Sequence, residues 1–268
     1  MRGRRPITHL LIDEAGQASE PASLVPTALL EPHGRLLLAG DPLQLGPCVI
    51  SHYVQRRGLG TSLMERLTKM EMYQSGDPDY VVMLRNNFRS SDDIIALPNE
   101  LFYNNQLRAC AEQDPLTVIC VLGERDHSRG VVFHGVLSRE QRVGKSPSYF
   151  NTMELELVQK YVDALIKNHR VEQHDIGIVT PYIRQVYKTK AWLRESGYDR
   201  VEVGTVESFQ GKEKRVVIIS CVRAQNQLLA HDARYQLGFL VDDKRFNVAL
   251  TRAKAKTIVI GNPLVLQR

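Results

Sequence analysis

The sequence has few of the features that mark secreted or membrane proteins. Its four cysteines form no CxxC pair and no zinc-type spacing, so we expect reduced, mostly buried thiols in an intracellular protein. No run of about 18 apolar residues occurs, and no membrane span is expected. The basic start of the chain, residues 1–6, has no apolar signal region beside it, which argues against secretion.

The sequence also lacks internal repeats and low-complexity stretches. Its 268 residues, 43% hydrophobic and 24% charged, suit one large or two modest globular domains. Residues 1–78 carry 8 basic and 8 acidic side chains, whereas residues 79–268 carry 27 and 22. A basic second part can attract a polyanion. On charge alone, however, an ordinary solvated surface explains this surplus better.

Apolar, β-branched segments alternate with helical segments along the chain. Strands are expected over residues 7–12, 35–39, 80–84, 117–121, 131–134, 176–179, 201–203, 216–222 and 257–260. Helices are expected over residues 20–30, 62–69, 91–103 and 244–252, and from residues 151 and 183 onward. This alternation predicts an α/β protein with parallel sheets. A polar segment at residues 74–79 reads as a linker between two parts.

Two adjacent carboxylates, Asp13 and Glu14, follow the strand over residues 7–12, which we expect to be buried. Open α/β sheets bind ligands at the carboxyl ends of their strands. In phosphoryl transfer one such acid can hold Mg²⁺ while its neighbour orients or deprotonates a water. Taken alone, the pair is more simply explained as a strand end with solvated acids.

A loop rich in Gly and Pro, residues 40–47, follows the strand over residues 35–39. Gly and Pro predict a tight turn, and it should lie at the same carboxyl edge as Asp13. The Gln44 amide in this loop could donate to a γ-phosphate. Without further support, a simple turn is again the simpler explanation.

Six segments together resemble superfamily 1 nucleic-acid helicases of the up-frameshift-like group, in the subgroup of the Armitage and Moloney leukaemia virus 10 helicases. The segments, in chain order, are residues 13–17, 40–47, 87–89, 180–185, 204–213 and 245–254. Each segment alone is weak, but their order is specific and they cover nearly the whole chain.

The resemblance implies RecA-like P-loop NTPase domains with parallel sheets. Residues 1–78 would be the carboxyl part of a first RecA-like domain, and residues 79–268 a nearly complete second one. The implied function is that of the carboxyl part of an ATP-dependent RNA helicase, moving 5′ to 3′ on single-stranded RNA in RNA silencing or RNA turnover. The implied location is cytoplasmic, with ribonucleoprotein granules as one candidate site and RNA-silencing or RNA-decay proteins as candidate partners.

The resemblance also implies roles in ATP and Mg²⁺ chemistry. Asp13 would ligate Mg²⁺, Glu14 would activate the attacking water, and Gln44 would sense the γ-phosphate. Arg89 and Arg252 would reach the γ-phosphate, because guanidinium stays charged and matches phosphoryl oxygens. A surface salt bridge is the alternative for each arginine. In the same comparison, Glu213 would hold the ribose and Gly211 would keep its loop close to the nucleotide.

Seven further residues would contact single-stranded nucleic acid in a protein of this kind. They are Ser148, Asn151, Thr180, Tyr182, Gln185, Thr205 and Ser208. Hydroxyls and amides that follow strand ends suit phosphates. For Asn151, a helix cap is an equally good explanation, because Glu154 three residues later completes a near capping box.

The sequence departs from the family pattern in two places. No GxxxxGK[ST] phosphate loop occurs: Lys145 lies in a Gly-Lys-Ser run, but position 139 is Arg where the first Gly should stand. Phe88 also stands where a Tyr is usual. The alternative function is therefore a catalytically inactive, shortened product that acts as an RNA- or protein-binding module, and we expect residues 1–268 alone to show no appreciable ATP hydrolysis.

Overall fold

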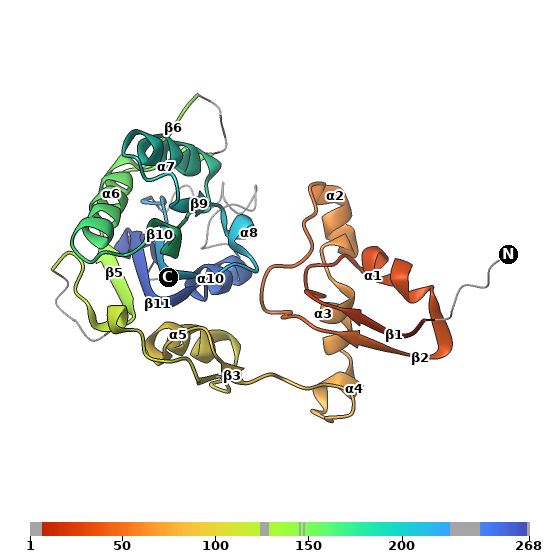
Figure 1. Ribbon diagram of the computed structural model, residues 1–268. Helices are drawn as coiled ribbons and strands as arrows, with labels where there is room; N and C mark the ends of the chain where they lie inside the picture. Colours follow the sequence, from red (N-terminus) through yellow and green to blue (C-terminus); the bar gives the residue numbers. More distant parts are fainter. Residues whose placement is uncertain (1–6, 124–128, 145, 147, 226–241, 267–268) are drawn as a thin grey trace. The chain divides into compact units, whose positions relative to one another are not determined.

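The computed structural model describes residues 7–123, 129–144, 146, 148–225 and 242–266. The chain forms two compact units, Met1–Leu84 and Arg85–Arg268 (Figure 1). The linker predicted at residues 74–79 thus precedes the division between the units, which falls after Leu84. The expected α/β class with parallel sheets is confirmed, and each unit carries its own parallel pairing.

Two parallel strands, β1 (Ile7–Ile12) and β2 (Leu30–Leu38), form the sheet of the first unit. Helix α1 (Glu20–Thr27) joins these strands and packs against both. The other helical elements are α2 (His52–Val54), η1 (Gln55–Leu59), α3 (Leu63–Thr68) and α4 (Glu71–Gln74). Helix α3 begins where predicted, because the Ser62 hydroxyl accepts a hydrogen bond from the Glu65 N–H at 3.0 Å.

The expectation that β1 is a buried strand is wrong. Its side chains are largely exposed: Leu11 is 69% exposed, and Leu37 on β2 is 55% exposed. Parallel strands are normally covered on both faces. A sheet of two strands has two open faces, and α1 covers only part of them. The apolar sequence of β1 is therefore typical of a strand that is covered on both faces. Among the described residues, no element provides that cover.

A five-stranded parallel sheet forms the centre of the second unit, in the order β5-β11-β10-β8-β9. Its strands are β5 (Val131–Gly135), β8 (Ile176–Val179), β9 (Glu202–Gly204), β10 (Lys214–Ser220) and β11 (Ala253–Gly261). β8 is buried along its whole length, and β10 from Val216 onward. Such runs are typical of strands covered on both faces.

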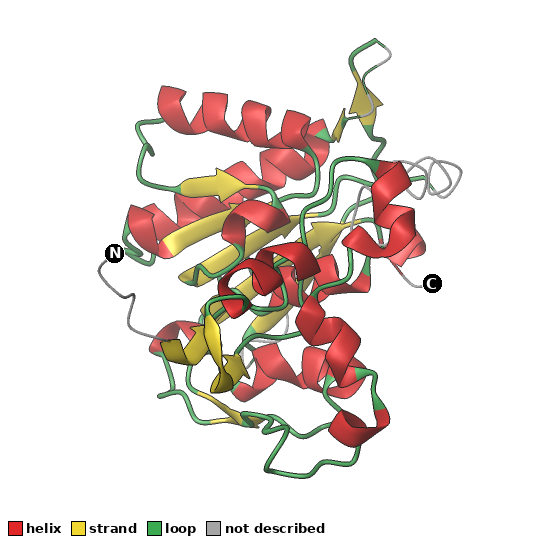
Figure 2. Ribbon diagram, turned by 90° about the vertical axis from the view of Figure 1, so that its right-hand side faces the viewer, coloured by secondary structure: helices red, strands yellow, loops and turns green. Residues whose placement is uncertain are grey.

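Helices cover this sheet. In Figure 1, α6 (Thr152–Lys167) and α7 (Ile183–Glu195) lie to the upper left of and above the strands, and α5 (Asp92–Phe102) lies below them; Figure 2 shows the helices in red beside the strands in yellow. The apolar stripe of α6 is buried against the sheet, as its 3.6-residue spacing predicts. The smaller elements are β3 (Asn86–Asn87), β4 (Arg108–Ala109), η2 (Pro115–Val118), β6 (Gln141–Arg142), β7 (Tyr149–Phe150), η3 (Gln173–Asp175), α8 (Val206–Phe209), α10 (Asp243–Leu250) and α11 (Pro263–Leu266).

Two predicted strands do not form. Residues 80–84 are irregular. A segment forms a strand only when it pairs with a neighbouring one, and among the described residues no strand pairs with this segment. Instead, residues 117 and 118 belong to a short 3₁₀ helix, η2, and residues 119–121 are irregular. There Asp114 caps the helix by accepting from the Leu116 N–H at 2.8 Å, and Pro115 occupies the first helical position. These two start signals outweigh the β-branched composition that follows.

The cysteines are more exposed than the sequence predicts. No disulfide is found among the described residues, but Cys48 and Cys110 are exposed and only Cys221 is buried. The prediction of mostly buried thiols is therefore wrong. Within the part of the chain that the structure describes, no helix combines the length and apolar character needed to span a membrane.

We predict that Ile218→Ala, in the middle of β10, lowers the unfolding free energy of the second unit by about 2–5 kcal/mol, because it leaves a cavity in a side-chain position that is 0% exposed. Trp192 is the sole tryptophan and packs against this core, so urea unfolding followed by its fluorescence reports on this unit. Leu137→Ala, at an exposed position, is the control. Equal stability of the two variants would contradict the assigned core.

Candidate functional site

In the first unit, the predicted acids lie in a loop that packs against the second predicted loop. Asp13 and Glu14 are exposed at the end of β1. The Ala15 N–H donates to the Ala39 carbonyl at 2.8 Å, and the Ala39 N–H donates to the Ile12 carbonyl at 2.8 Å. The loop over residues 40–47 therefore lies at the same carboxyl edge as the acids, as predicted.

Two glycines allow this close approach. A Cβ atom at Gly16 would lie 2.7 Å from the Asp41 carbonyl oxygen, and one at Gly40 would lie 2.9 Å from the Ala15 nitrogen. Gly40 also has a φ of +156°, which side chains rarely tolerate. Within the loop, the Gln44 amide donates to the Asp41 carboxylate at 3.0 Å. The two loops are thus held together by backbone contacts that leave the Asp13 and Glu14 side chains at the surface.

The donor set at this edge fits one hard cation poorly by itself. Among the described residues, no group of three or more His, Cys, Asp and Glu side chains could hold a metal ion. Mg²⁺, however, keeps most of its waters and is usually bound through one or two carboxylates together with substrate phosphates. An exposed Asp13 carboxylate fits that pattern, with a nucleotide supplying the other ligands.

In the second unit, charged residues gather where β10 and β11 begin. Arg89 donates to the Glu213 carboxylate at 2.8 Å, and Lys254 forms an ion pair with Glu213 at 2.6 Å. The Lys254 ammonium, and then the Arg89 guanidinium, lower the pKa of Glu213. Arg89 and Glu213 are predicted site residues, whereas no role is predicted for Lys254, although it lies in one of the six motif segments.

Thr251 brings the two predicted arginines together. Its carbonyl accepts from the Arg89 guanidinium at 3.3 Å, and its hydroxyl accepts from the Arg252 guanidinium at 3.0 Å. Arg252 is only 2% exposed and also donates to the Val248 carbonyl at 3.0 Å. Gly211 lies in the loop before Glu213 with a φ of +73°. The amino end of the sheet therefore carries the predicted residues Arg89, Gly211, Glu213 and Arg252.

The residues predicted to contact nucleic acid lie at the opposite, carboxyl end of the same sheet. Thr205 and Ser208 follow β9; Thr205 is half-buried and Ser208 is exposed. The other five are buried, namely Ser148, Asn151, Thr180, Tyr182 and Gln185. Their burial means that their side chains act mainly on the shape of this edge. A contact with nucleic acid stays a prediction for all seven.

Asn151 and Gln185 link two helix starts. The Asn151 side chain caps α6 by accepting from the Glu154 N–H at 3.2 Å, as the capping prediction requires. Gln185 on α7 accepts from the Asn151 N–H at 3.0 Å and donates back to its carbonyl at 3.2 Å. In a similar way, the Ser148 hydroxyl accepts from the Arg184 N–H on α7 at 3.0 Å. These bonds fix α7 against the segment before α6.

Glu154 also lies at this end, and the sequence predicts for it only a part in the start of α6. It is fully buried, and its carboxylate accepts from the Ser220 hydroxyl at 2.7 Å and from the Val222 N–H at 2.8 Å. Burial, reinforced by the nearby Glu140 charge, raises its pKa to about 8, against the lowering effect of these donors. A buried acid with a raised pKa had no signal in the sequence beyond the capping pattern.

A second buried charge pair lies beside this network. Arg223 and Glu140 approach to 3.4 Å, and their side chains are 3% and 0% exposed. The Arg223 guanidinium stacks over the Tyr149 ring at 3.8 Å and lies 5.2 Å from the Tyr182 ring centre. The predicted residue Tyr182 therefore packs on a buried cation. Lys145, the cation of the Gly-Lys-Ser run, lies outside the described residues.

The parallel sheet thus carries arginines and an acid at its amino end and a buried polar network at its carboxyl end. The comparisons specify the class. Two family models, each described as an AAA domain, match residues 59–264 and residues 1–52. The chain belongs to this AAA-domain family of helicases.

Similar proteins support this family assignment, and they include members of the subgroup that the sequence motifs resemble. The chain is 42% identical to the putative helicase mov-10-B.1 of Danio rerio, over 97% of this chain and 28% of that protein. It is 44% identical to the RNA helicase Mov10l1 of Homo sapiens, over 97% and 23%. It is 34% identical to the probable RNA helicase armi of Drosophila melanogaster, over 97% and 24%. The chain thus spans about a quarter of the length of these relatives.

The raised pKa of Glu154 leads to a prediction about pH. Because its folded pKa of about 8 exceeds the ordinary value of 4.5, its contribution to stability is complete below pH 4.5 and is lost as pH rises through 8. We expect the second unit to lose on the order of a few kcal/mol between pH 5 and pH 8. Glu154→Gln keeps the shape and the acceptor oxygen, so it should flatten this dependence.

The measurement is urea unfolding followed by Trp192 fluorescence at several pH values. Glu156→Gln, at an exposed position on the same helix, is the matched control and should keep the wild-type dependence. Parallel pH dependences for wild type and Glu154→Gln would show that this carboxyl does not titrate as assigned.

Proposed function

We propose that this chain is the carboxyl part of an ATP-dependent superfamily 1 RNA helicase that couples ATP hydrolysis to 5′ to 3′ movement on single-stranded RNA. The observation that carries the proposal is the gathering of Arg89, Glu213 and Arg252 around Thr251 at one end of the parallel sheet. The choice of RNA is supported by relatives that are named RNA helicases.

The proposed nucleotide chemistry uses the exposed acids of the first unit. Asp13 would bind Mg²⁺ together with the phosphates, and Mg²⁺ would supply charge neutralisation on the transferring oxygens. Glu14 would accept a proton from the attacking water. Its carboxylate accepts from the Gln17 amide at 2.7 Å, which orients it. Gln44 would exchange its bond to Asp41 for a bond to the γ-phosphate.

The two arginines would play different parts. Arg89 is held by Glu213 and the Thr251 carbonyl, and its guanidinium is partly exposed, so it can exchange an exposed ion pair for a phosphate at little cost. Arg252 is buried and bonded to the preceding helix, α10, so its reach to a γ-phosphate would require the Thr251 region to rearrange. Glu213, released from Arg89, would accept from the ribose hydroxyls, and Gly211 would let its loop approach the sugar.

The proposed RNA contacts are at the carboxyl end of the sheet. Thr205 and Ser208 would contact the strand through their hydroxyl groups. The buried set of Ser148, Asn151, Thr180, Tyr182 and Gln185 would act by fixing the loops whose backbone faces the strand. We further propose a cytoplasmic location, with ribonucleoprotein granules as a candidate site, and RNA-silencing or RNA-decay proteins as candidate partners.

The test is phosphate release by a longer protein that joins this chain to an upstream GxxxxGK[ST] loop. Single-stranded RNA should stimulate release. Glu14→Gln should abolish it while preserving nucleotide binding, because the amide keeps the shape and removes the base. Glu71→Gln, an exposed substitution in the same unit, should change nothing. RNA-stimulated hydrolysis by the Glu14→Gln protein would refute the assigned role, and robust hydrolysis by residues 1–268 alone would refute the dependence on that loop.

A further inference from the structure

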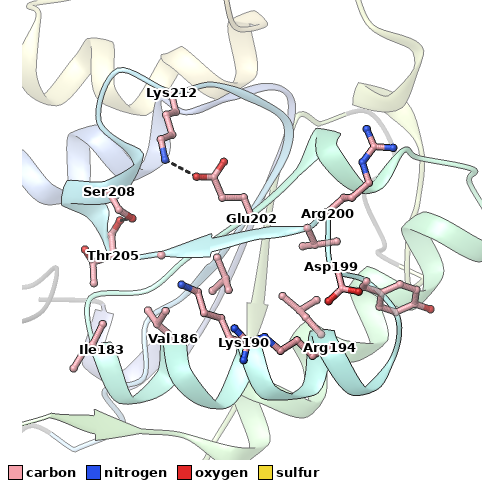
Figure 3. A pocket seen from close by; sticks show the side chains of 15 residues that line it. Ile183, Val186, Lys190, Arg194, Asp199, Arg200, Glu202, Thr205, Ser208 and Lys212 are labelled. Atoms are coloured by element: carbon pink, nitrogen blue, oxygen red, sulfur yellow. Dashed lines mark hydrogen bonds and ion pairs between the residues drawn. The ribbon is translucent and has the colours of Figure 1, made fainter.

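A groove runs along the outer edge of the sheet in the second unit, between α7 and β9 (Figure 3). Its volume is about 620 Å³, which lies within the range of sites that hold ligands. Its floor is apolar and includes Val186 and Val203. The groove begins beside Thr205 and Ser208 and extends toward Arg200 at its other end. None of the roles proposed above uses this groove beyond Thr205 and Ser208.

The charge of the groove is positive. Four basic side chains and two acidic ones line it. Lys212 forms an ion pair with Glu202, as the dashed line in Figure 3 marks. By contrast, no ion pair of Lys190, Arg194 or Arg200 is found within the described residues, and all three are exposed. These three cations share the groove with one further carboxylate, Asp199, which forms no ion pair in the part of the chain that the structure describes, so the lining keeps a surplus of two positive charges, four basic against two acidic side chains.

Two of these cations repel each other along the helix. Lys190 and Arg194 are four residues apart on α7, so they share one helix face. Like charges at this spacing cost a few tenths of a kcal/mol in an isolated helix. A ligand that carries repeated negative charge would remove this cost. A polymer with an anionic backbone can contact both side chains at once, because its negative charges repeat along its length.

We propose that this groove binds the sugar-phosphate backbone of single-stranded RNA and extends the strand's path beyond Thr205 and Ser208. The inference rests on the proposed function, because it lengthens the same RNA site. The hydroxyls at one end lead directly to the cations along α7. Sequence-independent binding of this kind combines a basic groove with a tolerant apolar surface, and the lining of this groove has both. An acidic peptide is the competing occupant.

The experiment compares the 268-residue chain with its Lys190→Ala/Arg194→Ala variant by fluorescence anisotropy. The probes are single-stranded RNAs of about 6 and about 20 nucleotides, at several salt concentrations. For the longer strand, the variant should bind several-fold more weakly, and its plot of log K against log salt should be shallower by about 1.4, because each lost phosphate contact removes about 0.7. The shorter strand should bind both proteins alike.

The control removes a Lys and an Arg elsewhere. Lys160→Ala/Arg170→Ala changes two exposed cations at and after α6, and it should leave the salt dependence unchanged. If wild type binds RNA and the groove variant keeps its full slope, the groove inference fails while the proposed function stands. If wild type binds no RNA, both fail. If the groove variant loses binding to a polyglutamate peptide but not to RNA, the groove is a peptide site and the inference is overturned.

Discussion

The carboxyl end of the central sheet depends on one buried carboxylate. Val222, directly after β10, has a φ of +68°, which is rare for a β-branched residue. Its N–H donates to Glu154, and its carbonyl accepts from the Asn151 amide at 3.1 Å. Both backbone groups are thus satisfied by the start of α6, and the backbone of Asn151 bonds in turn to the Gln185 side chain on α7. Removing the Glu154 carboxyl group would leave the N–H of this strained turn without a partner in a buried site.

The two ends of the sheet differ in how deeply their polar side chains are buried. At the amino end, Arg89, Glu213 and Lys254 form ion pairs that are partly exposed, and such pairs exchange partners at low cost. At the carboxyl end, the network around Glu154 is buried and joined by hydrogen bonds, and such networks are rigid. In the proposed function, nucleotide would bind where charges can be exchanged, and RNA would lie along an edge whose shape is fixed. β10 joins the two ends directly.

The sequence predicted the alternation of strands and helices because hydrophobic periodicity and helix caps are local signals. Ser62, Ser91 and Asn151 mark helix starts in the structure as expected. The predictions that are wrong depend on contacts between segments that are distant in sequence. Residues 80–84 have strand composition and no strand beside them, and β1 has the sequence of a buried strand without a cover. The Glu154 network was missed for the same reason, because its acceptors and donors come from segments 66 and 68 residues apart.

In the proposed function, the two ends of one sheet bind two ligands, nucleotide and RNA, whose affinities are linked. The most direct measurement is the Kd of single-stranded RNA for the longer protein, with and without a non-hydrolysable ATP analogue. We expect the analogue to change this Kd by about 5-fold or more, and RNA to change the affinity for the analogue by the same factor. An RNA Kd that is identical with and without the analogue would contradict this linkage.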